Sequence, residues 1–135
     1  MTWKKPNRAR EVLLERRKFL KENHAGIAGA LVTLAHVLVD SGRPEEALPL
    51  VEEAESIFAE AFMPDHEKQY TTASLRGQIL FRLGRVGEAG PVLEQAYDAL
   101  VTRLGKTHYD TRNAELRLAE ARAPSEERIP SRAKR

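Results

Sequence analysis

Apolar residues recur at every third or fourth position along most of the chain, which is the spacing of amphipathic α-helices. The pattern predicts six helices and no strands, at residues 8–21, 25–41, 44–62, 67–83, 86–104 and 108–122. Gly42 supplies the positive φ that ends a helix, and Pro44 has the fixed φ suited to a first helical position. The predicted fold class is therefore all-α, built from antiparallel helix hairpins.

This pattern repeats after 42 residues. Eight of the 25 aligned pairs from 38/80 to 62/104 are identical, including Gly42 with Gly84 and Arg43 with Arg85. A His-containing pair opens each unit at the same period, at positions 23–24, 65–66 and 107–108. Small residues occupy equivalent mid-helix places, Gly77 among them, and predict close approach of paired helices because glycine otherwise weakens a helix.

The period divides the chain into one repeat domain with short ends. We expect a degenerate half repeat at 8–22, full repeats at 23–64 and 65–106, and a terminal half repeat at 107–122. Residues 1–7 are expected to be flexible, and residues 123–135 to form a disordered basic tail with too few apolar groups to fold. The first helix lacks the partner that should precede it, and the last lacks the partner that should follow it.

The two segments LVTLAHVLVDSGRPEEALPLVEEAESIF and LRGQILFRLGRVGEAGPVLEQAYDAL resemble tetratricopeptide repeats, in the 42-residue form found in kinesin light chains. The resemblance covers residues 8–122 and implies a right-handed stack of helix hairpins whose first helices form a concave face. It also implies a non-catalytic scaffold that binds a protein or peptide partner.

Alignment to the repeat places a mixed apolar and polar strip on that concave face. The candidate partner-binding residues are Val32, His36, Val39, Asp40, Ser74, Gln78, Phe81, Arg82, Leu116 and Glu120. Such a strip is expected to hold an extended or helical peptide. Changing Phe81 or Arg82 is then expected to weaken binding without unfolding the protein.

The alternative hypothesis is a structural or self-associating regulatory fragment of a larger bacterial signalling protein. It is motivated by the first helix, whose apolar side has no preceding partner and would act as an interface. Homo-oligomers are therefore among the expected partners.

The chain departs from the family at positions that bind peptides. Kinesin light chain repeats commonly carry an Asn pair in the first helix, and here those places hold Val32/Thr33 and Ser74/Leu75. The Lys/Asn/Arg clamp that grips a carboxy-terminal carboxylate is missing as well. Recognition of kinesin-type cargo and of chaperone tails is therefore not expected.

The charge of the chain argues against nucleic acid as a partner, and the length of its uncharged stretch argues against a membrane span. Residues 1–22 carry 8 basic and 3 acidic side chains, residues 23–122 carry 10 and 15, and residues 123–135 carry 4 and 2. The net charge of +2 is too weak for a basic nucleic-acid-binding face. The uncharged stretch 23–39 is shorter than the roughly 20 apolar residues of a membrane span, and a cytoplasmic location is expected.

No catalytic or cofactor-binding constellation is evident. His24, His66 and His108 lie one repeat apart, too far for one metal ion, and are interpreted as residues that shape the turn into a helix. The chain has no Cys, and adjacent carboxylates such as Glu45 and Glu46 point in different directions on a helix. We therefore expect no enzyme activity, no metal and no cofactor.

Overall fold

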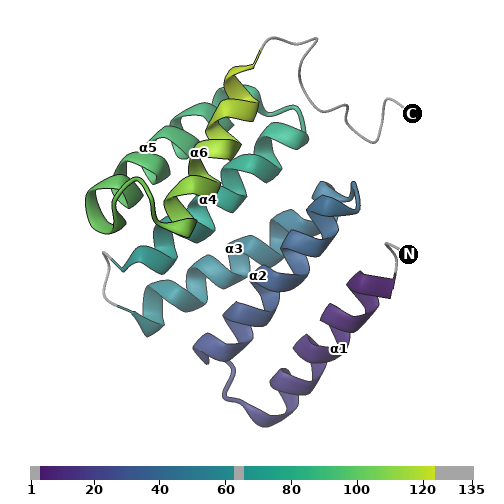
Figure 1. Ribbon diagram of the computed structural model, residues 1–135. Helices are drawn as coiled ribbons and strands as arrows, with labels where there is room; N and C mark the ends of the chain where they lie inside the picture. Colours follow the sequence, from purple (N-terminus) through teal and green to yellow (C-terminus); the bar gives the residue numbers. More distant parts are fainter. Residues whose placement is uncertain (1–3, 63–65, 124–135) are drawn as a thin grey trace. The chain divides into compact units, whose positions relative to one another are not determined.

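The computed structural model describes residues 4–62 and 66–123, which contain six α-helices and no strand (Figure 1). The helices are α1 (Lys4–Phe19), α2 (Ala25–Asp40), α3 (Pro44–Ala61), α4 (Glu67–Arg82), α5 (Val86–Leu104) and α6 (Tyr109–Arg122). The all-α prediction is confirmed. The chain forms two compact units that divide between His66 and Glu67, with α1–α3 in the first and α4–α6 in the second. Most of the predicted tail, residues 124–135, lies outside the described part.

Five of the six helices begin and end within two residues of their predicted bounds, and α1 differs most. It begins at Lys4, four residues before the predicted start, and ends at Phe19. Pro6 lies in its first turn, where the missing backbone N–H has no partner to lose. The helix therefore extends back through part of the segment that was expected to be flexible.

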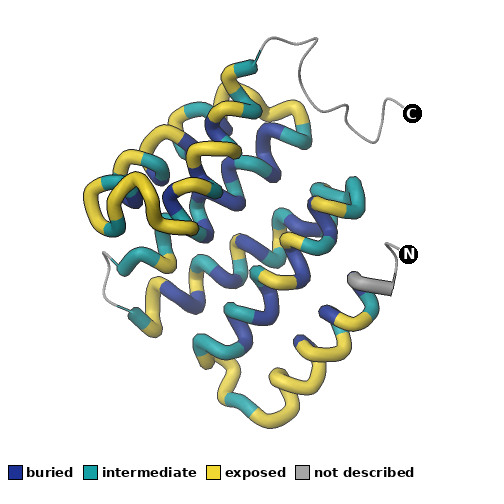
Figure 2. Tube along the Cα trace, viewed as in Figure 1, coloured by how far each residue is buried: buried dark blue, intermediate teal, exposed yellow. Residues whose placement is uncertain are grey.

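In the first unit, α2 is the central helix and packs against both α1 and α3. Its apolar side chains Ile27, Leu31 and Leu38 are at most 1% exposed. Figure 2 shows buried segments along α2. Ala35 of α2 and Ala54 of α3 are fully buried, and α2 and α3 pack against each other.

In the second unit, α4 packs against both α5 and α6. The helices α4 and α5 approach closely at Gly77, where an added Cβ atom would lie 2.7 Å from Cγ of Leu93 and 3.3 Å from Cγ1 of Val92. The absence of a side chain at Gly77 therefore lets α4 pack closely against α5, as the place of this residue in the repeat predicts, because a side chain would overlap α5.

The turn between the two helices of each hairpin is built in the same way in both units. Gly42 and Gly84 have φ of 76° and 84°, the left-handed region that glycine adopts without strain. The next residue in each case, Arg43 or Arg85, pairs with the glutamate three positions on, Glu46 or Glu88. The Arg85 guanidinium holds the pKa of Glu88 below its usual value.

Candidate functional site

The predicted partner-binding residues of the first unit lie along α2. Val32, His36 and Asp40 are four residues apart and share one face, with His36 and Asp40 exposed and Val32 half-buried. Val39 is 3% exposed and belongs to the core. Only the first three are therefore accessible to a partner, and we call them the α2 strip.

In the second unit, the predicted residues of α4 and α6 meet each other. The guanidinium of Arg82 donates two hydrogen bonds to the carboxylate of Glu120, at 2.5 and 2.9 Å. The two side chains are only 18% and 12% exposed. Each neutralises the other, so this pair holds α4 against α6 and offers a partner little net charge.

Arg117 completes the α4–α6 contact and was not among the predicted residues. Its guanidinium donates to Oγ of Ser74 at 3.1 Å and to Oε1 of Gln78 at 3.3 Å. Helical phase places Ser74 and Gln78 on one strip but carries no information about which cation of another helix reaches it. A signal was present, since Arg117 precedes the candidate Glu120 by three residues on the same helix.

Three candidates of the second unit differ in accessibility. Ser74 is fully buried and Phe81 is 9% exposed, so neither presents a surface to a partner. Leu116 of α6 is 68% exposed and is accessible to a partner.

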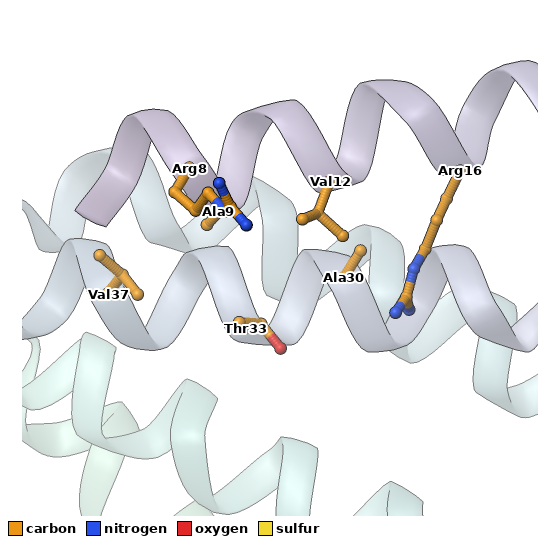
Figure 3. Close-up of a pocket in the computed structure, with 7 residues that line it drawn as sticks. All are labelled: Arg8, Ala9, Val12, Arg16, Ala30, Thr33 and Val37. Carbon is orange, nitrogen blue, oxygen red and sulfur yellow. The ribbon is translucent and has the colours of Figure 1, made fainter. Parts of the chain in front are cut away.

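A separate hollow of about 330 Å³ lies between α1 and α2 in the first unit (Figure 3). Its lining is apolar apart from Thr33 and two guanidinium groups, and it was not predicted. The lining residues are Arg8, Ala9, Val12, Arg16, Ala30, Thr33 and Val37. Arg16 also donates to the backbone carbonyl of Gly26 at 2.8 Å, which ties the end of α1 to the start of α2.

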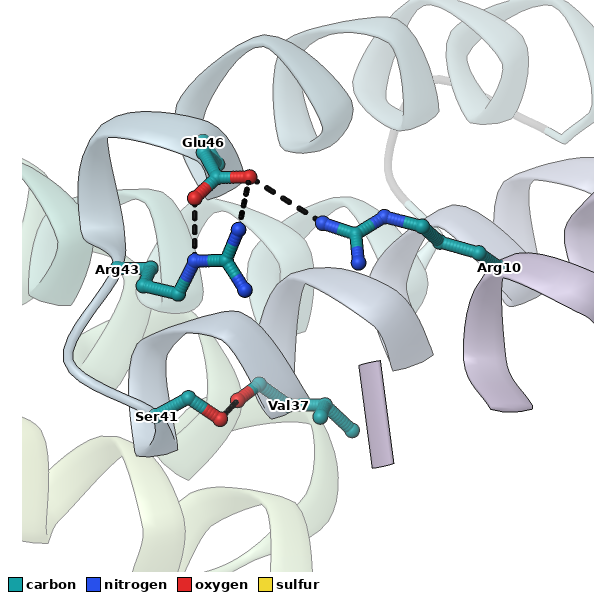
Figure 4. Close-up of polar contacts among 5 residues, drawn as sticks. All are labelled: Arg10, Val37, Ser41, Arg43 and Glu46. Atoms are coloured by element: carbon teal, nitrogen blue, oxygen red, sulfur yellow. Dashed lines mark hydrogen bonds and ion pairs between the residues drawn. The ribbon is translucent and has the colours of Figure 1, made fainter. Parts of the chain in front are cut away.

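The basic side chains of α1 partly serve the first unit itself. Arg10 pairs with Glu46 of α3 at 3.2 Å, and the same carboxylate accepts from Arg43 (Figure 4). Arg17 donates to both carboxylate oxygens of Glu53 at 2.8 and 2.9 Å. The positive amino-terminal segment is therefore matched to the acidic side of α3, which its composition alone did not reveal.

The described residues show neither a metal-ligand cluster nor a membrane-spanning helix. In the ranges 4–62 and 66–123, no group of three or more His, Cys, Asp or Glu side chains is arranged to hold a metal ion. No helix in the same ranges is both long and apolar enough to cross a membrane.

The comparisons with known proteins agree with the hairpin architecture. A family model described as tetratricopeptide repeat matches residues 26–100. Among solved structures, the nearly identical TPR-like repeats of a protein described as a kinesin light chain of Podosopora anserina match with a TM-score of 0.76 and 22% identity. The match covers 89% of this chain and 57% of that chain, and a variant of the same protein gives the same values.

No curated protein matches the sequence. The chain spans little more than half the length of the solved neighbours, and their identity to it is low enough that they bear on the fold alone. The family model, in contrast, matches more than half of the chain. This chain belongs to the tetratricopeptide repeat family.

Proposed function

We propose that the chain is a non-catalytic interaction module that binds a peptide or short helix along the first helices of its repeats, with the α2 strip as the main contact. The family is a protein-interaction scaffold and is typically non-catalytic. Val32, His36 and Asp40 offer an apolar, an aromatic and an acidic group in a line, which suits a peptide that lies along the helix.

Asp40 is the observation that carries this proposal. It is the last residue of α2, where the partial negative charge of the helix end disfavours a carboxylate. Among the described residues no hydrogen bond or ion pair to its side chain offsets this cost. A residue that breaks a local rule without compensation is often functional. A partner with a basic side chain opposite Asp40 would supply the missing compensation.

Asp40→Lys tests the strip. Proteins captured from the source lysate by the wild-type chain are identified, and the peptide that binds directly is titrated against wild type and variant. We expect Asp40→Lys to weaken binding about tenfold or more, the effect of about 1.4 kcal/mol. Removal of a carboxylate from the helix end should leave thermal stability unchanged or slightly raised.

Glu60→Lys is the matched control, because Glu60 is an exposed carboxylate near the end of α3 with the same charge change. Equal affinity of the wild type and both variants would refute the α2 strip. Phe81 and Arg82 are less suitable targets than the sequence suggested, since one is buried and the other holds α4 to α6. Their substitution would mix loss of folding with loss of binding.

A further inference from the structure

Exposed apolar side chains concentrate on α1 and α6. Within the described ranges six large apolar residues are exposed, and five of them are on these two helices. They are Val12, Leu14 and Phe19 on α1, and Tyr109 and Leu116 on α6. An isolated exposed leucine needs no explanation, but this concentration indicates interfaces.

The repeat register relates the hollow of the first unit to a filled site in the second. Helices α1 and α2 correspond to α5 and α6, two periods or 84 residues later. In the second unit α4 packs on α5 and α6 together. The residues that α4 touches there include Val92, Leu93 and Arg117. Their counterparts, Arg8, Ala9 and Thr33, all line the hollow. The hollow is therefore the place that a helix equivalent to α4 would fill.

The exposure of Val12 also indicates that a helix could pack here. It is 39% exposed, whereas its counterpart Ala96 is 2% exposed beneath the helices that pack on α5. The first unit thus has room for one more helix on the surface that α1 and α2 form around the hollow, and we call this surface the seat. The repeat register specifies the position of that helix.

We propose that α6 of a second copy of this chain occupies the hollow. One period separates α6 from α4, so α6 is a helix of the same type. Its own unit covers only one side of it: Arg112, Glu115, Leu116 and Ala119 are all exposed. Helix α2 packs on two helices at once, on α1 and on α3, so a helix of this type can have neighbours on both sides.

The side chains that would meet are matched in size. Gly77 of α4 faces Leu93, and their counterparts in the proposed contact are Ala119 of one copy and Ala9 of the other. Ala119 is one methyl group larger than Gly77, and Ala9 is smaller than Leu93, so the larger side chain on the helix has more space opposite it. Ser74 of α4 faces Arg117, and their counterparts are the exposed Leu116 and the pocket residue Thr33. In the proposed contact, apolar Leu116 therefore lies against uncharged Thr33, where the second unit has polar Ser74 against charged Arg117.

A cation–π contact is preserved with its roles exchanged. In the second unit the Arg103 guanidinium lies 5.4 Å from the ring centre of Tyr70. The counterparts are Phe19 of one copy, which is 80% exposed, and the exposed Arg112 of the other. The ring moves to the seat and the cation to the incoming helix, which restores the same attraction.

The contact is heterologous, because one copy uses its amino-terminal helices and the other its carboxy-terminal helix. Each copy carries both surfaces, so the mode of assembly is head to tail. None of the three residues of the α2 strip lines the hollow, although His36 is the counterpart of Glu120, which contacts α4 in the second unit.

Sedimentation velocity of the full chain over a range of concentrations tests the proposal. We expect the mean mass of the wild type to rise with concentration through dimers to larger species. Leu116→Glu on α6, and Val12→Glu or Phe19→Lys on α1, should each leave the chain monomeric at concentrations where the wild type associates. Circular dichroism establishes that each variant keeps its helix content and melting temperature.

Leu14→Glu is the matched control. Leu14 is on the same helix as Val12 and is more exposed, at 61%, but its counterpart Asp98 is exposed on the outer side of α5. This variant should associate like the wild type.

Mixing two variants distinguishes the proposed contact from a symmetric one. A chain with Leu116→Glu keeps an intact seat, and a chain with Phe19→Lys keeps an intact α6. The mixture should form a one-to-one dimer and stop there, although neither variant associates alone.

Three results would overturn the proposal. They are a wild type that stays monomeric up to roughly millimolar concentration, a range that includes weak complexes; association that survives both the α1 and the α6 variants; and a mixture that remains monomeric. A monomeric wild type would mean that α6 of a second copy does not bind the hollow. Association that survives the variants would place the interface elsewhere on the chain.

Discussion

Histidine performs an uncommon task at two helix starts. Nδ1 of His24 accepts the backbone N–H of Gly26 at 2.8 Å, and Nδ1 of His108 accepts that of Asp110 at 3.1 Å. Both residues have extended backbone conformations, with ψ of 135° and 143°, which aim the ring at the first turn. The prediction that the repeated histidines shape the turn into a helix is confirmed for His24 and His108, because each satisfies a donor that the helix itself leaves unpaired.

Replacement of His24 by alanine should lower the free energy of unfolding by about 1 kcal/mol, the usual effect of losing an N-cap acceptor. His24→Asn should keep most of the stability, since asparagine is among the best capping residues. Chemical denaturation at neutral pH measures both. If the alanine variant is as stable as the asparagine variant, the hydrogen bond to Gly26 contributes nothing.

At the scale of helices, close packing is set by where side chains are missing. Gly77 and Gly87 are both inside helices and both lower helix propensity. An added Cβ at Gly77 would overlap buried Leu93, whereas at Gly87 it would meet nothing within 4 Å. The two glycines are alike in propensity and opposite in their surroundings.

Gly77→Ala should therefore destabilise the protein and Gly87→Ala should stabilise it. Overpacking costs about 1–3 kcal/mol, and the gain in helix propensity offsets about 1 kcal/mol of that. We expect a net loss of about 1 kcal/mol for Gly77→Ala and a gain of up to about 1 kcal/mol for Gly87→Ala. Thermal or urea unfolding of the two variants provides the comparison. A gain in both would mean that α5 moves away from α4 without cost.

Helices could be predicted from the sequence because their signals are local. Gly42 and Pro44 mark the turn, and the periodicity gives the phase of each helix. The candidate site was harder. Phase alone placed Ser74 and Phe81 on an outer strip, but α4 packs on two helices at once and the structure buries both residues. The pairing of Arg82 with Glu120 spans 38 residues and depends on how α6 returns to α4, which no local pattern encodes.

At the scale of the whole molecule, charge and topology act together. The basic residues in 1–22 and the acidic residues of α3 are far apart in the sequence. In the first unit they lie next to each other, and Arg10 pairs with Glu46 and Arg17 with Glu53. These pairs are more than a third exposed, so salt screens them and each contributes only about 0–1 kcal/mol. Apolar burial between neighbouring helices supplies most of the stability.

Side-chain contacts between helices span about one repeat, with Arg10 and Glu46 36 residues apart and Arg117 and Ser74 43 residues apart, whereas most backbone contacts are local in sequence. Short loops cost little entropy to close, so helical proteins with local contacts fold in microseconds to milliseconds. We expect the main refolding phase after dilution from denaturant to finish within about 10 ms. Stopped-flow circular dichroism measures it, and a main phase of seconds would indicate that the units do not fold through these local contacts.

The division between His66 and Glu67 also orders events during synthesis. The first unit has all of its helices once residue 66 has left the ribosome, before any of α4–α6 is available to it. Domains generally fold as units in this order, at roughly 5–20 residues added per second. Since α1 and α2 form the seat, a nascent chain displays the receiving half of the proposed contact while its own α6 is still unmade. Completed copies nearby already carry theirs, so assembly is able to begin on chains that are not yet finished.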